Sequence, residues 1–399
     1  MKKITLLCFA VSLIFTVHGQ AQYEAYKPAS SQSNRLTYIP RAHTQLRVLR
    51  SSELNFAATG TAQFNTPAMI RSAYGLPSTG GANAIAIVDA FHYPTALNDF
   101  NEFATAFALP KETSSDVTAT GNQVLQVVYA SEKQPGSVGN LAASWSIEAA
   151  LDIEWAHAMA PHAKIYLVEA ASDSLPDLYH AVIVASQLPN VREVSMSWGS
   201  GEFSSETSLD ALFDRPGIVF LAATGDSSDA LSYPALSPNV VACGGTSLQR
   251  DPNGVLLQET AWIYSGCGVS SVESRPIWQN IISSIIGTRR ATSDISFVAD
   301  PQTGAYVYDS TPYQGLSGWY VAGGTSLSTP CLAGVINNAG ASGNGFATSS
   351  SSELSRIYSN LGNSRAFRDV SAGRDGRYTS ILGWDYATGV GTPIGLSGK

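Results

Sequence analysis

The sequence predicts an α/β fold with a doubly wound, mostly parallel sheet and helices on both faces. Short apolar runs of strand length recur along the chain, and helix-like stretches lie between several of them. Strands that are apolar throughout are typical of a parallel sheet covered on both sides. Ligands of such sheets bind beyond the carboxyl ends of the strands, so functional residues are expected there.

The predicted elements follow one another in an alternating order. The expected strands cover residues 84–90 (AIAIVDA), 163–170 (AKIYLVEA), 191–199 (VREVSMSWG), 217–226 (GIVFLAATGD) and 239–246 (NVVACGGT). The expected helices include residues 146–160 (SIEAALDIEWAHAMA) and 175–187 (LPDLYHAVIVASQ). The Ser-rich residues 341–355 are expected to form a surface loop before a further helix.

The chain divides into three parts by composition. Residues 1–21 contain two lysines, an apolar run and small residues, which predicts a secretory signal and a secreted or periplasmic protein. Residues 22–63 lack sustained periodicity and are interpreted as an N-terminal extension or linker. The α/β pattern runs from residue 64 to 399. No later stretch approaches the roughly 20 apolar residues of a membrane span, so no membrane partner is expected.

Charge and cysteine content narrow the class of protein. The formal net charge is -8 and there are no basic runs, which argues against a nucleic-acid partner. Charged residues make up only 14% of the chain, which is compatible with an acidic medium. Cys243, Cys267 and Cys331 follow the signal and match no zinc pattern. They are interpreted as core residues or thiols near the site, with one disulfide allowed.

The pentapeptide GGTSL occurs twice, at residues 244–248 and 323–327, so Ser247 and Ser326 are both candidate nucleophiles. Ser247 precedes QRDPNG, a polar turn that is expected to end a strand and start nothing. Ser326 precedes LSTPCLAGVINNAG, an apolar helical stretch with Pro330 in its predicted first turn. Only Ser326 is therefore expected at a helix N-terminus.

At a helix N-terminus, the Ser326 hydroxyl would be exposed above the sheet, and free backbone N–H groups could stabilise a developing oxyanion. The preceding Gly323 and Gly324 allow the chain and a substrate to approach closely. Serine is also a common helix cap for hydrogen-bonding reasons alone. These residues by themselves leave both interpretations of Ser326 open.

The pattern G-T-S-x-x-x-P at residues 324–330 also surrounds the nucleophile of subtilisin-like proteases, which would require a histidine base. None of the histidines after the signal lies in the small His-Gly-Thr setting that this similarity requires. These are His43, His92, His157, His162 and His180. His157 and His162, at the end of an apolar helix, are expected to be structural.

Glu148 and Asp152 offer a replacement for the missing histidine base. They are four residues apart in a mostly apolar predicted helix, so they share one face. Buried carboxyls are costly unless they are paired, hydrogen-bonded or protonated. Two carboxyls that share a proton can act as a general base and its orienting partner at acidic pH. The alternative is a solvated acidic stripe without a catalytic role.

With these residues, the chain resembles the sedolisins, a family of serine-carboxyl peptidases with a subtilisin-like fold. The resemblance runs from about residue 64 to residue 393 in a single large catalytic domain. Its landmarks are YGLP, AIAIVDAFHYP, EAALDIE, VSMSWG, ATGDSS, YPALSPNVVACGGTSL, ADPQTGAYVY, GGTSLSTP and GWDYATGVGTP. These motifs occur in order over most of the chain, which makes the resemblance specific.

The resemblance implies a role for each of four residues. Ser326 would be the nucleophile, Glu148 the general base and later acid, and Asp152 the partner that holds Glu148. Asp226, in ATGDSS, would be the aspartic acid of the oxyanion hole. A carboxyl donates a hydrogen bond to an oxyanion only when it is protonated, which requires low pH or a raised pKa.

The resemblance also implies supporting and metal-binding residues. Asp89 and Trp198 match positions that support the Glu148 and Asp152 pair through hydrogen bonds. The C-terminal loop, residues 369–385, matches the calcium loop of the family, with one structural Ca²⁺ ion. Its implied ligands are the side chains of Asp369 and Asp385 and the carbonyls of Val370, Ile381 and Gly383.

Two features depart from the family pattern. Only about 42 residues separate the signal from the catalytic part, whereas the family usually carries a long folded prosegment. Cys267 replaces a glycine in GCGVSS, and Cys331 follows the motif proline, where a small or apolar residue is more usual.

The resulting hypothesis is a secreted, acid-acting, monomeric endopeptidase that cleaves protein or peptide substrates through an acyl-enzyme on Ser326. One alternative is a neutral Ser-His-Asp protease of the subtilisin type. The other is a non-catalytic binding protein that keeps the fold.

Overall fold

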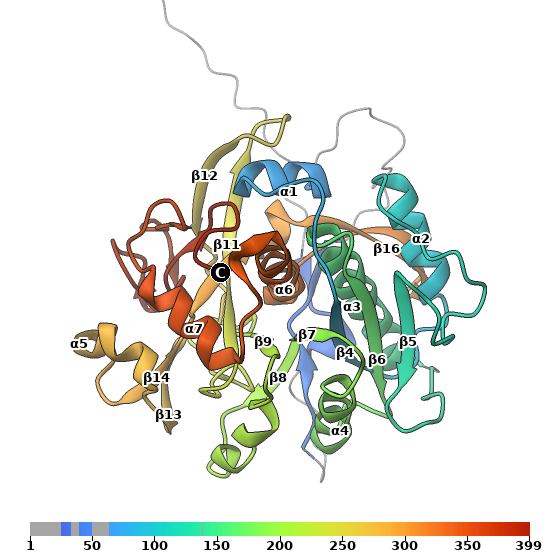
Figure 1. Cartoon of the computed structure of the whole chain (residues 1–399), viewed down its shortest axis with the longest axis horizontal. Coiled ribbons are helices and arrows are strands. Elements are labelled where there is room, and N and C mark those ends of the chain that lie inside the picture. The colour runs from blue at the N-terminus through green and yellow to red at the C-terminus, as the bar shows by residue number, and fades with distance from the viewer. Residues whose placement is uncertain (1–24, 33–39, 50–63, 138) are drawn as a thin grey trace, which may run out of the picture.

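The computed structural model describes residues 25–32, 40–49, 64–137 and 139–399 (Figure 1). The predicted signal, residues 1–21, lies outside the described residues, as does a large part of the predicted extension, residues 22–63. In the described part of the chain, no helix is long and apolar enough to cross a membrane.

The described residues form a central sheet of eight strands in the order β12-β11-β9-β7-β4-β6-β5, with β15 beside β11. All neighbouring pairs in it are parallel except β11 with β12. The strands are β4 (Ala84–Ala90), β5 (Leu125–Tyr129), β6 (Lys164–Ala170), β7 (Val191–Met196), β9 (Val219–Ala223), β11 (Val241–Arg250), β12 (Leu256–Ala261) and β15 (Ile295–Val298). The prediction of a mostly parallel, doubly wound sheet is confirmed.

Both faces of this sheet are buried, which explains the continuous apolar runs. In β4, Ile85 and Ile87 belong to the core shared with α3 and α6, whereas Ala86 and Val88 belong to the core shared with α4. Neighbouring residues of a strand point to opposite faces, so both parities must be apolar when both faces are covered. The helices therefore cover both faces, as the sequence predicts.

Helices α3 and α6 pack against one face and contact each other in the middle of the molecule (Figure 1). At Gly334 in α6, a Cβ atom would lie 2.6 Å from the Cβ of Met159 in α3, so glycine permits this close approach. The helices are α1 (Pro67–Tyr74), α2 (Ala96–Ala106), α3 (Asn140–Met159), α4 (Leu175–Ala185), α5 (Ser283–Ile286), α6 (Thr325–Ala339) and α7 (Ser350–Ser359).

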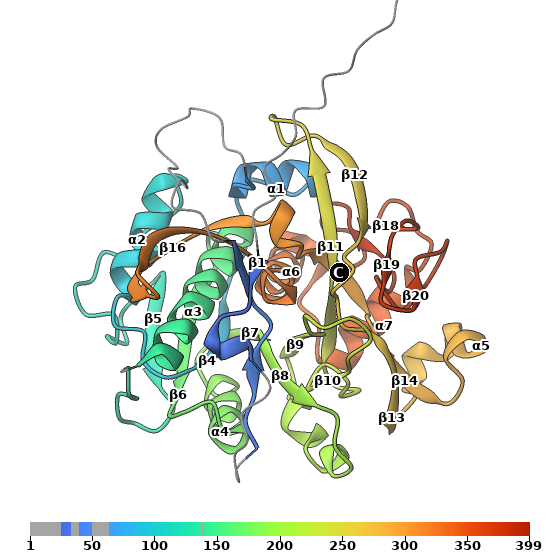
Figure 2. The same ribbon diagram turned by 180° about the vertical axis from the view of Figure 1, so that it is seen from behind.

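The N-terminal extension contributes strands that its sequence does not predict. A sheet with the order β1-β3-β17-β16 joins β1 (Ala25–Tyr26) and β3 (Arg47–Leu49) to β17 (Leu316–Gly323) and β16 (Ala305–Tyr313). Another joins β2 (His43–Thr44) to β8 (Trp198–Gly201) and β10 (Ser232–Tyr233). Figure 2 shows the N-terminal strands, in blue, between α3 and β8. Strands this short carry no usable periodicity, and their partners lie far away in the sequence.

One expectation about the first GGTSL copy is wrong. The strand that contains Ser247 continues to Arg250, and the turn after it leads into β12, which pairs with β11 as a hairpin. The turn residues Asp251 to Gly254 therefore connect two strands rather than only ending one. The remaining short strands pair as β13 (Gly268–Ser274) with β14 (Arg289–Thr292), β18 (Phe367–Arg368) with β21 (Thr392–Pro393), and β19 (Arg374–Asp375) with β20 (Tyr378–Thr379).

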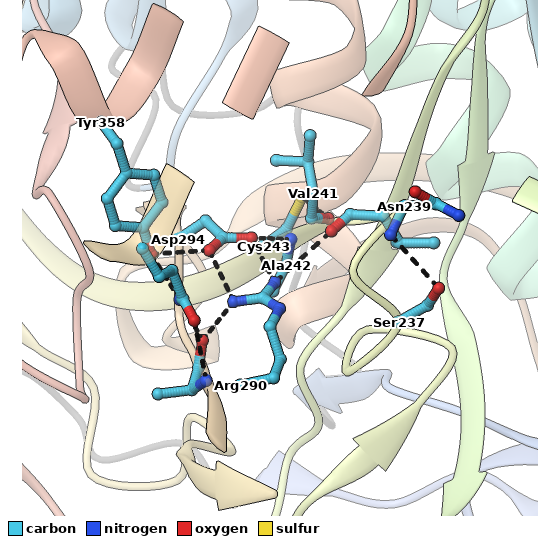
Figure 3. A network of polar contacts seen from close by, with 11 residues as sticks. Ser237, Asn239, Val241, Ala242, Cys243, Arg290, Asp294 and Tyr358 are labelled. Carbon is cyan, nitrogen blue, oxygen red and sulfur yellow. Dashed lines mark hydrogen bonds and ion pairs between the residues drawn. The ribbon is translucent and has the colours of Figure 1, made fainter. Parts of the chain in front are cut away.

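A buried ion pair fixes β11 beside the segment that leads into β15 (Figure 3). The guanidinium of Arg290 lies 2.6 Å and 2.8 Å from the two carboxylate oxygens of Asp294. The Tyr358 hydroxyl and the Ala242 N–H each donate to Asp294 at 2.8 Å. Each carboxylate oxygen of Asp294 thus accepts one hydrogen bond from the Arg290 guanidinium and one from a neutral donor. These bonds compensate the burial of the carboxylate.

Cys243, Cys267 and Cys331 are all buried and free, so none of them pairs in a disulfide. The structure therefore agrees with the interpretation of these residues as core thiols and not with the allowed disulfide.

Candidate active site

Ser326 is the second residue of α6, and Gly324 is the one residue between the end of β17 at Gly323 and the start of α6 at Thr325. Its side chain is buried, and its hydroxyl donates to the carbonyl oxygen of Ser197 at 3.2 Å. The hydroxyl of the other candidate, Ser247 on β11, donates instead to the Asp300 carboxylate at 2.6 Å. Only Ser326 therefore lies at a helix N-terminus next to the buried carboxyl groups described below.

Pro330 does not lie in the first turn of α6, as the sequence suggests, but is the sixth residue of that helix. Proline lacks an N–H, so the carbonyl four residues earlier, that of Ser326, has no helical partner. The Ser197 hydroxyl lies 3.3 Å from this carbonyl oxygen. The proline thus frees a carbonyl that ties the nucleophile candidate to the end of β7.

Glu148 and Asp152 lie on the buried face of α3 that meets α6. Burial, followed by the charge of Asp89, raises the pKa of Glu148 well above its usual value. The hydroxyls of Ser326 and Thr44 lie near enough to act against this shift by hydrogen bonding to Glu148. Neither Glu148 oxygen makes a well-aligned hydrogen bond with any described residue, so a small side-chain rotation is needed to engage Ser326.

Asp152 is held by one hydrogen bond, which Ser197 donates to its Oδ1 at 2.9 Å. Burial, then the charges of Asp89 and Glu148, raises the pKa of Asp152 well above its usual value. The two carboxyls of α3 therefore interact, and at least one of them is favoured in the protonated form.

Asp89, at the end of β4, is also buried, and neither carboxylate oxygen has a hydrogen-bond partner among the described residues. Burial, together with the charge of Glu169, raises the pKa of Asp89 to about 8. The expected hydrogen bonds from Asp89 to the pair on α3 are absent in the described residues. Its influence on Glu148 and Asp152 is electrostatic, because its negative charge opposes theirs.

Trp198 also differs from the prediction. Its indole N–H donates to the carbonyl oxygen of Val88 at 2.7 Å and not to a carboxyl group. This bond fixes the first residue of β8 against the end of β4, next to Asp89. Trp198 therefore positions strands around the site and does not hold Glu148 or Asp152 directly.

Asp226 follows β9 and faces the N-terminus of α6. Its Oδ1 accepts hydrogen bonds from the N–H of Thr325 at 2.8 Å and from the Thr325 hydroxyl at 3.1 Å. Its Oδ2 has no hydrogen bond with a described residue. Burial raises the pKa of Asp226 to about 6, and the positive charge of Arg47 acts in the opposite direction. Its proton is therefore available in mild acid.

Gly324 opens the space between Asp226 and the N-terminus of α6. Its φ is 104°, and a Cβ atom there would lie 2.0 Å from the carbonyl oxygen of Gln45 and 2.5 Å from Asp226 Oδ2. Both oxygens therefore face one small space that only a glycine leaves open. The backbone N–H of Ser326 donates to the same Gln45 oxygen at 3.0 Å.

The N-terminal extension occupies this space, which no sequence signal predicts. The N–H of Gln45 donates to Ser197 O at 3.0 Å, and before it His43 and Thr44 pair antiparallel with Gly199 and Trp198. After it, Arg47 pairs antiparallel with Gly323. The extension thus crosses the N-terminus of α6 as an extended strand, with the Gln45 carbonyl at the nucleophile candidate.

Two of the described histidines, His157 and His92, are engaged with groups other than Ser326. Burial lowers the pKa of His157 to about 4, and its Nε2 lies 2.9 Å from the Pro110 carbonyl oxygen. His92 contacts Glu169 at 2.8 Å. The carboxyl that lies near enough to hydrogen-bond the Ser326 hydroxyl is that of Glu148, whose raised pKa this hydroxyl acts to lower.

The C-terminal loop brings Asp369 and Asp385 together. The Gly383 N–H donates to Asp369 at 2.7 Å, and the Ile381 N–H donates to Asp385 at 3.0 Å. Burial raises the pKa of Asp385 to about 6, and the charge of Asp369 adds to this shift. Among the described residues, no three His, Cys, Asp or Glu side chains gather in a way that could hold a metal ion. A cation here would depend on main-chain oxygens as well as the two carboxylates.

Comparison with known proteins identifies the family. Residues 138–340, about half of the chain, match the Subtilase family. The chain is 26% identical over 430 residues to sedolisin of Pseudomonas sp. (strain 101), covering 95% of this chain and 69% of that protein. It is 32% identical over 288 residues to kumamolisin of Bacillus sp. (strain MN-32), covering 62% of this chain and 49% of that protein. The chain thus spans only about half the length of the second relative.

Solved structures agree with this placement. Pseudomonas sedolisin, a serine-carboxyl proteinase complexed with two molecules of pseudo-iodotyrostatin, superposes with a TM-score of 0.68 at 25% identity, covering 84% of this chain and 96% of that chain. The S41 psychrophilic protease shares the fold, with a TM-score of 0.50 at 20% identity, covering 83% of this chain and 99% of that chain. The chain therefore belongs to the subtilase family of serine peptidases and, within it, to the sedolisins.

Proposed function

We propose that this protein is a secreted, acid-acting serine-carboxyl peptidase that hydrolyses peptide bonds of proteins and peptides through an acyl-enzyme on Ser326. The observation that carries the proposal is the placement of the Ser326 hydroxyl beside the Glu148 carboxyl, with a peptide carbonyl on the Ser326 N–H at 3.0 Å. Membership of the sedolisins supports the same reaction class.

In the proposed reaction, the Ser326 oxygen attacks the carbonyl carbon of the substrate and Glu148 takes the hydroxyl proton. Glu148 then returns the proton to the leaving nitrogen. A water molecule hydrolyses the ester by the same route in reverse. Asp152 is the proposed partner of Glu148, because the Glu148 charge raises the pKa of Asp152, and Ser197 fixes Asp152 by the 2.9 Å hydrogen bond.

The developing oxyanion would be held by two donors. One is the backbone N–H of Ser326, which already contacts a carbonyl oxygen at 3.0 Å. The other is Asp226 in its protonated form, since its Oδ2 faces the same space beside Gly324. A donor aimed at this oxygen is typically worth a factor of about 10² to 10³ in kcat.

Acid action follows from the charges of the site. Asp226 must be protonated to donate, and its pKa is raised to about 6. In acid, the neighbours Asp89 and Asp152 are also protonated, because burial raises the pKa of both. Their negative charges then no longer add to the effect of burial on the pKa of Glu148, whose ionised form accepts the serine proton.

Hydrolysis of an unfolded protein at about pH 4 and pH 7 tests this proposal with wild type, Ser326→Ala, Glu148→Gln and His157→Ala. We expect hydrolysis only in acid, loss of it in the first two variants, and retention in His157→Ala. Glu154→Gln is the matched control, since Glu154 is buried in the same helix but accepts from the Tyr308 N–H. Loss of hydrolysis in His157→Ala together with retention in Glu148→Gln would instead support a histidine base.

Secretion and a structural calcium ion complete the proposal. Residues 1–21 have the composition of a secretory signal, so mature protein recovered from the medium or periplasm should lack them. The carboxylates of Asp369 and Asp385, with the carbonyls of Val370, Ile381 and Gly383, would supply an all-oxygen donor set that suits Ca²⁺. When bound, the ion would crosslink the two ends of the loop. We further propose a monomer.

A further inference from the structure

We propose that Tyr264, Trp262 and Asp226 form a specificity subsite for an arginine side chain two residues beyond the cleaved bond, and that this subsite, occupied by Arg47, directs self-cleavage between Gln45 and Leu46. The inference rests on the proposed function and extends it to a substrate preference and a processing site.

The register of the extension identifies the bond. The Gln45 carbonyl oxygen accepts from the Ser326 N–H and lies in the space beside Asp226 Oδ2. The Gln45 N–H donates to Ser197 O, so the residue is held on both sides of its Cα. The carbonyl carbon attacked by Ser326 is therefore that of Gln45, and the leaving nitrogen is that of Leu46.

The Arg47 side chain lies in a site suited to a guanidinium. Its guanidinium carbon lies 4.1 Å from the centre of the Tyr264 ring and 5.4 Å from that of Trp262. One terminal nitrogen donates to the Asp226 carbonyl oxygen at 2.8 Å, and Nε lies 3.9 Å from Asp226 Oδ2. A planar cation that stacks on aromatic rings while donating in its plane is arginine and not lysine.

Arginine at this position is coupled to the reacting carbonyl through Asp226. The Asp226 carboxyl faces the oxyanion space with its Oδ2 3.9 Å from Arg47 Nε, and the Asp226 main-chain carbonyl accepts from the Arg47 guanidinium. The Arg47 backbone pairs with Gly323, one residue before Gly324. A correctly seated Arg47 therefore fixes the chain immediately after the bond, where small displacements are costly to reaction.

The proposed step is balanced with water as the co-reactant. The Ser326 oxygen bonds to the Gln45 carbonyl carbon, its proton passes to Glu148, and the carbon–nitrogen bond to Leu46 breaks as Glu148 protonates that nitrogen. Water then hydrolyses the ester. The products are a carboxyl terminus at Gln45 and an amino terminus at Leu46, with Ser326 regenerated.

Mass spectrometry of the full chain incubated at about pH 4 tests the inference. We expect wild type to yield a new amino terminus at Leu46, and Arg47→Ala to yield it about tenfold more slowly. Arg47→Glu should be slower still, and Arg47→Lys intermediate. Tyr264→Ala should slow the cut like Arg47→Ala, and the double variant should be no slower than either single variant.

Arg192→Ala is the matched control, because Arg192 also lies over an aromatic ring, that of Phe346, and donates to a main-chain carbonyl, that of Gly217, but stands at the end of β7 opposite to Ser197. It should cut at the wild-type rate, and thermal unfolding of every variant checks that each one folds. A peptide AHTQLRVL, added to the processed enzyme, should be cut faster than AHTQLAVL.

Cleavage of Arg47→Ala at the wild-type rate would overturn the inference, as would additive effects in the double variant. If wild type hydrolyses an added unfolded protein but never cuts after Gln45, the inference fails and the proposed function stands. If wild type hydrolyses neither, the proposed function fails.

Discussion

The backbone N–H of Ser326 donates to the carbonyl oxygen of Gln45 at 3.0 Å, although the two residues are far apart in the sequence. A helix N-terminus normally leaves such an N–H without an intrahelical partner. Here a residue of the N-terminal extension satisfies it, in the place that a substrate carbonyl would take in the proposed reaction.

Replacing Gly324 with alanine should abolish hydrolysis with little loss of secondary structure. The new Cβ would fall 2.0 Å from a carbonyl oxygen in the oxyanion space, so the substrate could not reach the Ser326 N–H. We expect kcat/KM at about pH 4 to fall by 10² or more. Gly318→Ala is the control, because Gly318 also has a positive φ, of 94°, but only Tyr308 lies near its Cβ position, at 3.9 Å. Equal losses in both variants would point to backbone strain alone.

Replacing Asp226 with asparagine should extend hydrolysis toward neutral pH. The wild-type carboxyl, with its pKa raised to about 6, loses its proton and its donor role as the pH rises through that value. An amide donates at every pH. We expect the wild-type kcat/KM to fall about tenfold per pH unit above that value, and the variant to fall less. A variant profile that falls at the same pH as the wild type would show that another group controls this limb.

Replacing Asp89 with asparagine should make the protein less sensitive to alkaline pH. Burial raises the pKa of Asp89 to about 8 from an ordinary value of 3.8. The folded chain therefore keeps a proton that the unfolded chain releases in this window, and the resulting stability is lost as pH rises through about 8. Calorimetry at about pH 5 and about pH 8 should show a smaller decrease in Tm for the variant than for wild type.

The exposed Asp116 provides the control for that measurement, since its carboxyl is held by Thr118 rather than buried. Asp116→Asn should keep the wild-type difference in Tm between the two pH values. A wild-type Tm that does not decrease toward pH 8 would contradict the expected protonation of Asp89.

Removal of calcium should lower the Tm if Asp369 and Asp385 hold the ion. Two neighbouring carboxylates that lose a shared cation repel each other, and binding to the folded state alone contributes about 2.7 kcal/mol at a hundredfold excess over Kd. We expect chelation to lower the Tm of wild type and to leave that of Asp385→Asn nearly unchanged. Added Mg²⁺ should restore less of the Tm than added Ca²⁺. Equal Tm values with and without chelator in wild type would rule out the site.

The sequence predicts elements whose signal is local. Strand β4 is predicted with its observed bounds, because all of its residues except Asp89 are apolar, on both faces. Ser326, Glu148 and Asp226 could be placed together through the motifs around them, and the structure brings them together at one helix terminus. The partner of the Trp198 indole could not be predicted, since a motif position does not state which acceptor a side chain reaches.

The path of the extension could not be predicted for a different physical reason. His43 and Thr44 form a strand of two residues whose partners, Gly199 and Trp198, are far away in the sequence. Main-chain pairing of this kind depends on free strand edges at the site and not on side-chain periodicity. The aromatic surroundings of Arg47 likewise come from a separate loop, at Trp262 and Tyr264.

Strand β3 lies inside a sheet, between β1 and β17. After cleavage between Gln45 and Leu46, the new amino-terminal segment would remain in this sheet. The pairing of Arg47 to Leu49 with β17 does not involve the cleaved bond. Maturation would thus involve two events, chemical scission followed by peeling of a strand from its neighbours. Turnover of foreign proteins should show a lag after scission, set by how fast that strand detaches.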